Sequence, residues 1–151
     1  MTPSPRILVL EARFYEDLAD QLAEGAGAVL AKAGAVVERQ SVPGCFELPL
    51  AMKLRLESAP ASAGFDGVVA LGCVIRGETD HYDHICREVS RALMDLSVGL
   101  KMPLGFGMLT CPSYALAQVR AAVSGKNKGA EAAHACLAMI ALKRSVLSGA
   151  S

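Results

Sequence analysis

The segment from Leu71 to His81 combines an expected anion-binding turn with a group that can transfer protons. Leu71 to Ile75 is apolar and predicts a buried strand, and the polar residues after it predict a turn that opens a helix. Backbone N–H groups and the helix dipole favour phosphate at such a helix start, where Gly77 permits close approach and Thr79 adds a hydroxyl donor. Histidine is the residue type whose proton moves most easily near neutral pH, so His81 is the candidate proton donor and acceptor.

A second candidate cluster extends from Val42 to Pro49, at the expected end of another strand. A proline-glycine pair favours a tight turn there, and Phe46 and Glu47 place an aromatic ring and a carboxylate beside it. Either Glu47 binds a polyol, or it complements a helix dipole while Phe46 enters the core. Phe14, just after the first expected strand, either stacks on a flat heterocycle or belongs to the core.

The remaining charged candidates are two histidines and two cations. His81 and His84 can share one helix face, but no third ligand with metal-site spacing accompanies them, so the sequence predicts no metal site. Arg120 and Lys128 lie in two further expected helices, where each is either an anion-binding group or an ordinary surface charge. The residues around Arg120 and Lys128 do not decide between these two roles.

Alternating strands and helices must position these groups. Apolar runs predict strands at Arg6–Glu11, Ala35–Val42, Phe65–Val74 and Pro103–Thr110. Helical spacing predicts helices at Tyr15–Ala33, Phe46–Glu57, Ser113–Ser124 and Lys128–Val146, with another after His81 and a small-residue loop at Ala59–Gly64. This order predicts an α/β fold, a flavodoxin-like three-layer α/β/α sandwich whose four-stranded parallel sheet carries helices on both faces. Ligands bind such sheets at the carboxyl ends of the strands, where the candidate residues fall.

The composition indicates one globular domain without a polyanionic partner. With 151 residues, 52% of them hydrophobic and 20% charged, the chain is expected to form a single domain over residues 1–151, with flexible ends at residues 1–5 and 147–151. Fifteen basic residues balance fifteen acidic ones, so net charge gives no reason to expect binding to nucleic acid or to an anionic membrane.

The sequence also predicts a cytoplasmic location. The apolar run Ile7–Leu10 is too short for the hydrophobic region of a signal peptide. The uncharged stretch Met102–Val119 is interrupted by prolines and glycines, which argues against a membrane span. The five cysteines contain no C-x-x-C pair, and their odd number favours reduced thiols.

Six motifs in order give the sequence a specific resemblance. They are Arg13-Phe14, Val42-Pro43-Gly44-x-Phe46-Glu47-Leu48-Pro49, Gly72-x-Val74-Ile75-Arg76-Gly77-x-Thr79-x-His81, Phe106-Gly107-x-Leu109-Thr110, Arg120 and Asn127-Lys128-Gly129. Together they resemble the lumazine synthase family nearly end to end. The resemblance implies a transferase of riboflavin biosynthesis that condenses 5-amino-6-(D-ribitylamino)uracil with 3,4-dihydroxy-2-butanone 4-phosphate. It implies release of phosphate and water, without a metal or organic cofactor.

The resemblance also implies roles for individual residues. Phe14 would stack on the uracil ring, and His81 would move protons. The ring and the ribityl chain would be held by Cys45, Phe46, Glu47, Cys73, Val74 and Ile75. The phosphate would contact Gly77, Glu78, Thr79 and Arg120. Lys128 would help to hold the phosphate or the departing charge, and Phe106 would complete the substrate site.

Finally, the resemblance implies a homo-oligomer whose active sites lie between subunits. Phe106, Arg120 and Lys128 would come from one subunit and the other site residues from its neighbour. The expected assembly is a ring of five subunits, or a hollow shell of twelve such rings. Two other functions fit the same fold: a non-catalytic module that binds riboflavin or a related flavin, and a mainly structural ring or shell protein.

Overall fold

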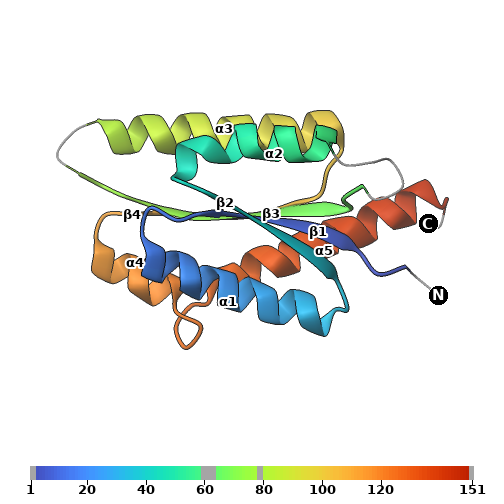
Figure 1. Cartoon of the computed structure of the whole chain (residues 1–151), viewed down its shortest axis with the longest axis horizontal. Helices are drawn as coiled ribbons and strands as arrows, with labels where there is room; N and C mark the ends of the chain where they lie inside the picture. The colour runs from blue at the N-terminus through green and yellow to red at the C-terminus, as the bar shows by residue number, and fades with distance from the viewer. Residues whose placement is uncertain (1–2, 59–63, 78–79, 150–151) are drawn as a thin grey trace.

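The computed structural model describes residues 3–58, 64–77 and 80–149, in which strands and helices alternate (Figure 1). The strands are β1 (Arg6–Ala12), β2 (Val36–Val42), β3 (Gly67–Ile75) and β4 (Leu104–Cys111). The helices are α1 (Glu16–Lys32), the short 3₁₀ helix η1 (Cys45–Glu47), α2 (Leu48–Ser58), α3 (His81–Leu100), α4 (Tyr114–Ala121) and α5 (Lys128–Leu147). Most of the predicted loop Ala59–Gly64 and the outermost residues of the two expected flexible ends lie outside the described residues.

The four strands form one parallel sheet in the order β2-β1-β3-β4. Figure 1 shows α2 and α3 on one face of this sheet and α1, α4 and α5 on the other. The predicted three-layer α/β/α sandwich is therefore confirmed. Strand order reverses between β1 and β3, and in such folds the crevice beyond the strand ends at this point is the usual ligand site.

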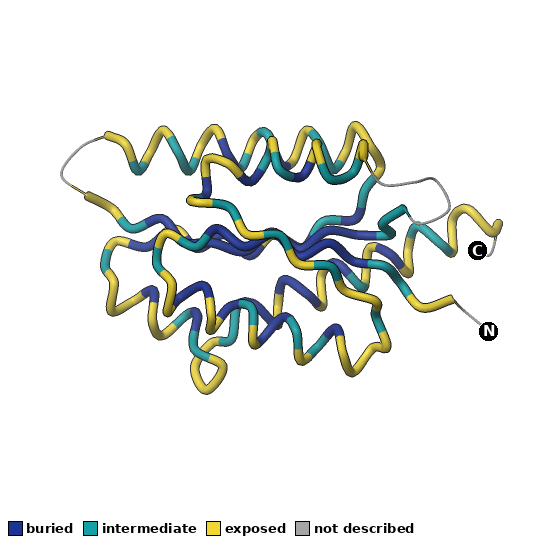
Figure 2. Tube along the Cα trace, in the orientation of Figure 1, coloured by how far each residue is buried: buried dark blue, intermediate teal, exposed yellow. Residues whose placement is uncertain are grey.

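Both faces of the sheet are covered, which explains why its central strands are nearly continuous apolar runs. Every residue of β3 before Ile75 is buried, and β1 is buried from Ile7 to Ala12 (Figure 2). One core joins these strands to α1, α4 and α5, and a second joins them to α2 and α3. Within the described residues, no helix combines the length and the apolar character that a membrane crossing requires.

Two predicted helix boundaries are wrong, and hydrogen bonds across turns explain both. The helix predicted from Phe46 instead begins as the 3₁₀ turn η1, in which the Glu47 N–H donates to the Gly44 carbonyl at 3.3 Å. The helix predicted to reach Ser124 ends at Ala121. Beyond it the chain folds back, and the Lys126 N–H donates to the Val119 carbonyl at 3.0 Å.

The edge strand β2 is polar and tied to its neighbours by ion pairs. Glu38 pairs with Arg6 at 3.7 Å and with Arg55 at 3.3 Å. Arg39 donates two hydrogen bonds to Glu11, a carboxylate of β1 that is almost fully buried. Arg13 also donates to Glu11, at 2.7 Å, so that two guanidinium groups compensate the buried charge.

Candidate active site

The carboxyl ends of β1, β2 and β3 surround a cavity of about 590 Å³, here called the strand-end pocket. Its lining residues are Phe14, Tyr15, Pro43, Gly44, Cys45, Phe46, Glu47, Cys73, Val74, Ile75, His81 and Ile85. Eight of the residues predicted to bind substrate or move protons are thus brought together here. The pocket lies where the strand order reverses, as the fold predicts.

Two phenylalanines at this pocket are exposed, which excludes the interpretation that they belong to the core. Phe14 is 73% exposed and Phe46 is 65% exposed, so neither belongs to the core. The Phe14 ring packs edge-on against Tyr15, with ring centroids 4.9 Å apart. Glu47 is exposed at the end of η1, directly before α2. Aromatic rings held in the open beside a cavity are typical of a surface that a ligand or a partner covers.

The start of α3 brings a titratable group to the same pocket. His81 is the first residue of α3, and it lines the cavity while remaining exposed in the single chain. His84 is exposed one turn further along. Gly77 is exposed just beyond β3, and Glu78 and Thr79, the other residues expected to bind phosphate there, lie outside the described residues.

The pocket thiols are poor nucleophiles. Burial raises the pKa of Cys45 to about 12, and burial together with neighbouring thiols raises the pKa of Cys73 to about 12. Both side chains are therefore protonated near neutral pH, and covalent attack by a thiolate is not expected. At a ligand site, such residues can contribute packing and backbone hydrogen bonds.

The buried thiols predict a loss of stability at alkaline pH. Burial raises the pKa of Cys136 from 9.0 to about 12, so above pH 9.0 the unfolded chain releases a proton that the folded chain retains. The contribution of this thiol to the free energy of unfolding is complete below pH 9.0 and is lost as the pH rises toward 12. In urea titrations between these pH values, we expect the free energy of unfolding of Cys136→Ala to fall less steeply than that of the wild type, by about 1 kcal/mol per pH unit. Parallel slopes would contradict this assignment.

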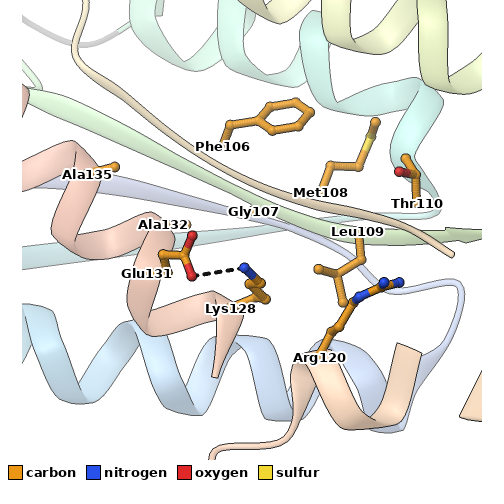
Figure 3. Close-up of a pocket in the computed structure, with 10 residues that line it drawn as sticks. All are labelled: Phe106, Gly107, Met108, Leu109, Thr110, Arg120, Lys128, Glu131, Ala132 and Ala135. Carbon is orange, nitrogen blue, oxygen red and sulfur yellow. Dashed lines mark hydrogen bonds and ion pairs between the residues drawn. The ribbon is translucent and has the colours of Figure 1, made fainter. Parts of the chain in front are cut away.

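A second cavity of about 380 Å³, the edge pocket, runs along β4 (Figure 3). Its lining residues are Phe106, Gly107, Met108, Leu109, Thr110, Arg120, Lys128, Glu131, Ala132 and Ala135. Phe106 extends from one face of β4, whereas Leu109 extends from the other, toward α4 and α5, which carry Arg120 and Lys128. The three remaining candidate residues, Phe106, Arg120 and Lys128, thus share this second pocket.

The two cations of the edge pocket have different partners. Lys128 donates to Glu131 at 3.0 Å, one turn along α5, and Figure 3 shows these side chains pointing toward each other. Arg120 donates from Nη1 to the thiol of Cys111 at 3.3 Å. Among the described residues, no carboxylate lies within ion-pair distance of Arg120. Arg120 therefore keeps an uncompensated positive charge beside a cavity, as an anion-binding residue requires.

The structure adds residues that the sequence did not single out. Glu131 is three residues after Lys128, and this helical spacing is a signal from which the ion pair was predictable. Tyr15 and Cys111 have no comparable local signal, because their contacts depend on the fold. Among the described residues, no group of three or more histidine, cysteine, aspartate or glutamate side chains could hold a metal ion.

Comparisons with known proteins identify the family of the chain. Residues 4–144 match the family model described as 6,7-dimethyl-8-ribityllumazine synthase. A protein of that name from a Methylobacterium species is 57% identical over 92% of this chain and 77% of its own length. Another, from Methylobacterium nodulans, is 55% identical over the same shares, and 6,7-dimethyl-8-ribityllumazine synthase 1 from Rhodopseudomonas palustris is 48% identical over 92% of this chain and 86% of its own. The chain belongs to the 6,7-dimethyl-8-ribityllumazine synthase family.

Proposed function

We propose that the protein is a 6,7-dimethyl-8-ribityllumazine synthase whose active site combines a strand-end pocket with an edge pocket. Family membership gives the reaction, and one structural observation supports the site: an open aromatic pocket beside a histidine and a separate pocket with an uncompensated arginine. The first suits a flat heterocycle and the second suits a phosphate ester. These are the two substrate types of the condensation.

In this proposal the strand-end pocket binds 5-amino-6-(D-ribitylamino)uracil. The exposed ring of Phe14 stacks on the pyrimidine, and Glu47 accepts hydrogen bonds from the hydroxyl groups of the ribityl chain. Backbone groups of Cys45, Phe46 and the residues from Cys73 to Ile75 provide the remaining polar contacts. The predominantly apolar wall excludes water from the reacting amines.

The phosphate of the four-carbon substrate lies between Arg120 and the helix start that follows β3. A planar guanidinium such as that of Arg120 can donate two parallel hydrogen bonds to phosphate oxygens. Gly77, Glu78 and Thr79 are the other residues that the family resemblance assigns to the phosphate. Lys128 adds charge near the departing phosphate. Glu131 holds Lys128 in place by the ion pair described above.

The proposed chemistry needs positioning and proton transfer. The primary amine of the uracil attacks the ketone, and loss of water gives an imine. Loss of a proton from the adjacent hydroxyl-bearing carbon with departure of phosphate then leaves an enol, which tautomerises to a new carbonyl. The ribitylamino nitrogen attacks this carbonyl, closing the ring with loss of a second water. His81, at the edge of the strand-end pocket, takes and returns the protons of these steps. The reaction uses neither a metal nor an organic cofactor, and no covalent bond to the enzyme forms.

A complete site in this proposal requires two chains. The strand-end and edge pockets share no described lining residue, so one chain holds two separate halves. The edge pocket of a neighbouring chain, with its Phe106, Arg120 and Lys128, would close the strand-end pocket. A ring of five subunits meets this need, and a shell of twelve such rings is the larger form of the same contact. The unpaired thiols of all five cysteines suit the cytoplasm as the site of this reaction.

Activity and flavin binding together test the proposal. Purified protein mixed with both substrates, without added metal, is expected to form a fluorescent product that chromatography identifies as 6,7-dimethyl-8-ribityllumazine. A control without the four-carbon phosphate should give no product. Tight binding of riboflavin without condensation would instead support a non-catalytic carrier, and absence of both would support a structural ring protein.

A further inference from the structure

We infer that Cys111 is a positioning residue, which orients the Arg120 guanidinium for the phosphate without cancelling its charge. This inference rests on the proposed function, because it assigns Arg120 to the phosphate. Cys111 touches no substrate in this scheme and acts on the phosphate through Arg120. Its thiol also contacts the thiol of Cys73. The side chains of Cys111 and Arg120 are in contact, the Cys111 thiol is buried, and a separate hydrogen bond fixes the Cys111 backbone.

The contact joins the end of β4 to the last turn of α4. Cys111 is the final residue of β4 and is fully buried. Ser113 caps α4 by accepting a hydrogen bond from the Leu116 N–H at 3.2 Å, which turns the chain sharply after the strand. The side chain of Arg120 then reaches back to β4, and its Nη1 donates to the Cys111 Sγ at 3.3 Å.

The chemistry of the acceptor distinguishes Arg120 from the paired arginines. Arg13 and Arg91 each donate to carboxylates, which hold the guanidinium but also neutralise it. A thiol is a weak, neutral acceptor. It can fix one N–H of the guanidinium while the positive charge and the other donors remain available for an anion.

The backbone of Cys111 is fixed as well. Its carbonyl accepts a hydrogen bond from the Arg76 N–H at 2.9 Å, where β3 gives way to the segment that contains Gly77. Its partner in the sheet is Ile75, a wall residue of the strand-end pocket. Cys111 therefore occupies a rigid position, from which a thiol can hold a side chain in one orientation.

Steady-state kinetics of two variants tests this role. In Cys111→Ala we expect the KM for 3,4-dihydroxy-2-butanone 4-phosphate, and the inhibition constant for inorganic phosphate, to rise about three- to tenfold. The KM for the uracil substrate should stay within about twofold of the wild type. Cys111→Ser keeps an acceptor at the same place and should restore both phosphate-dependent constants toward the wild-type values.

Cys136→Ala is the matched control. Cys136 is also fully buried, and it packs against Gly105 from α5, away from Arg120. Equal loss of thermal stability in the two alanine variants, with a phosphate-specific change only in Cys111→Ala, supports the positioning role. Unchanged phosphate constants in Cys111→Ala, or the same change in Cys136→Ala, overturns it. If the wild-type protein forms no lumazine, the proposed function fails instead.

Discussion

Arg120→Ala is expected to lower kcat/KM for lumazine formation about 100-fold or more. The reason is the loss of two charge-assisted hydrogen bonds to the phosphate, each contributing about 1.5–3 kcal/mol. No carboxylate within the described residues compensates Arg120, so its removal takes charge directly from the proposed anion site. Initial rates at varied concentrations of each substrate measure the effect, which should fall mainly on the phosphate-bearing substrate.

Arg91→Ala is the control for this prediction. Arg91 pairs with Glu88 at 2.9 Å and with Asp95 at 3.1 Å on the exposed side of α3, and it lines neither pocket. Its removal should leave kcat/KM nearly unchanged. Arg120→Lys should give an intermediate rate, because lysine keeps the charge but loses the planar pair of donors. Normal turnover in Arg120→Ala would refute the phosphate assignment.

Gly129→Ala is expected to destabilise the fold by about 3 kcal/mol. A Cβ at Gly129, in the first turn of α5, would overlap the backbone carbonyl of Leu22 in α1. The Cβ is attached directly to the α5 backbone and the carbonyl belongs to the α1 backbone, so neither can move without separating α1 from α5. The urea concentration at the unfolding midpoint measures the loss.

Gly27→Ala supplies the matched comparison within α1. A Cβ at Gly27 would meet no atom within 4 Å, and alanine is the better helix former. This variant should be as stable as the wild type, or more stable by up to about 1 kcal/mol. Equal midpoints for the two variants would show that the contact between α1 and α5 tolerates an added methyl group.

The fold was predictable because its strands carry a strong local signal. A parallel strand covered on both faces must be apolar along its length, and β3 meets this rule from Gly67 to Val74. Helix ends carry a weaker signal. The start of α2 and the end of α4 are decided by hydrogen bonds across turns, to Gly44 and Val119, which residue types alone do not indicate.

The candidate site was predictable to the extent that topology gathers strand ends in one place. Phe14, Glu47 and Val74 come from three separate segments, yet the order of a doubly wound sheet brings them together. The contacts that hold these residues in place could not be predicted, because they depend on side-chain directions in three dimensions. The contact of Arg120 with Cys111 and the pairing of Arg39 with Glu11, 28 residues away, have no signature in the sequence.

The ion pairs along β2 have a consequence for the behaviour of the protein at high concentration. An edge strand offers unpaired backbone groups to any other strand, and apolar edges promote aggregation by sheet extension. Glu38 and Arg39, held on β2 by Arg6, Arg55 and Glu11, place charges along this edge. A second sheet that docked there would bury these charges at a high cost in desolvation. The solubility of the protein at high concentration therefore depends on residues remote from both pockets.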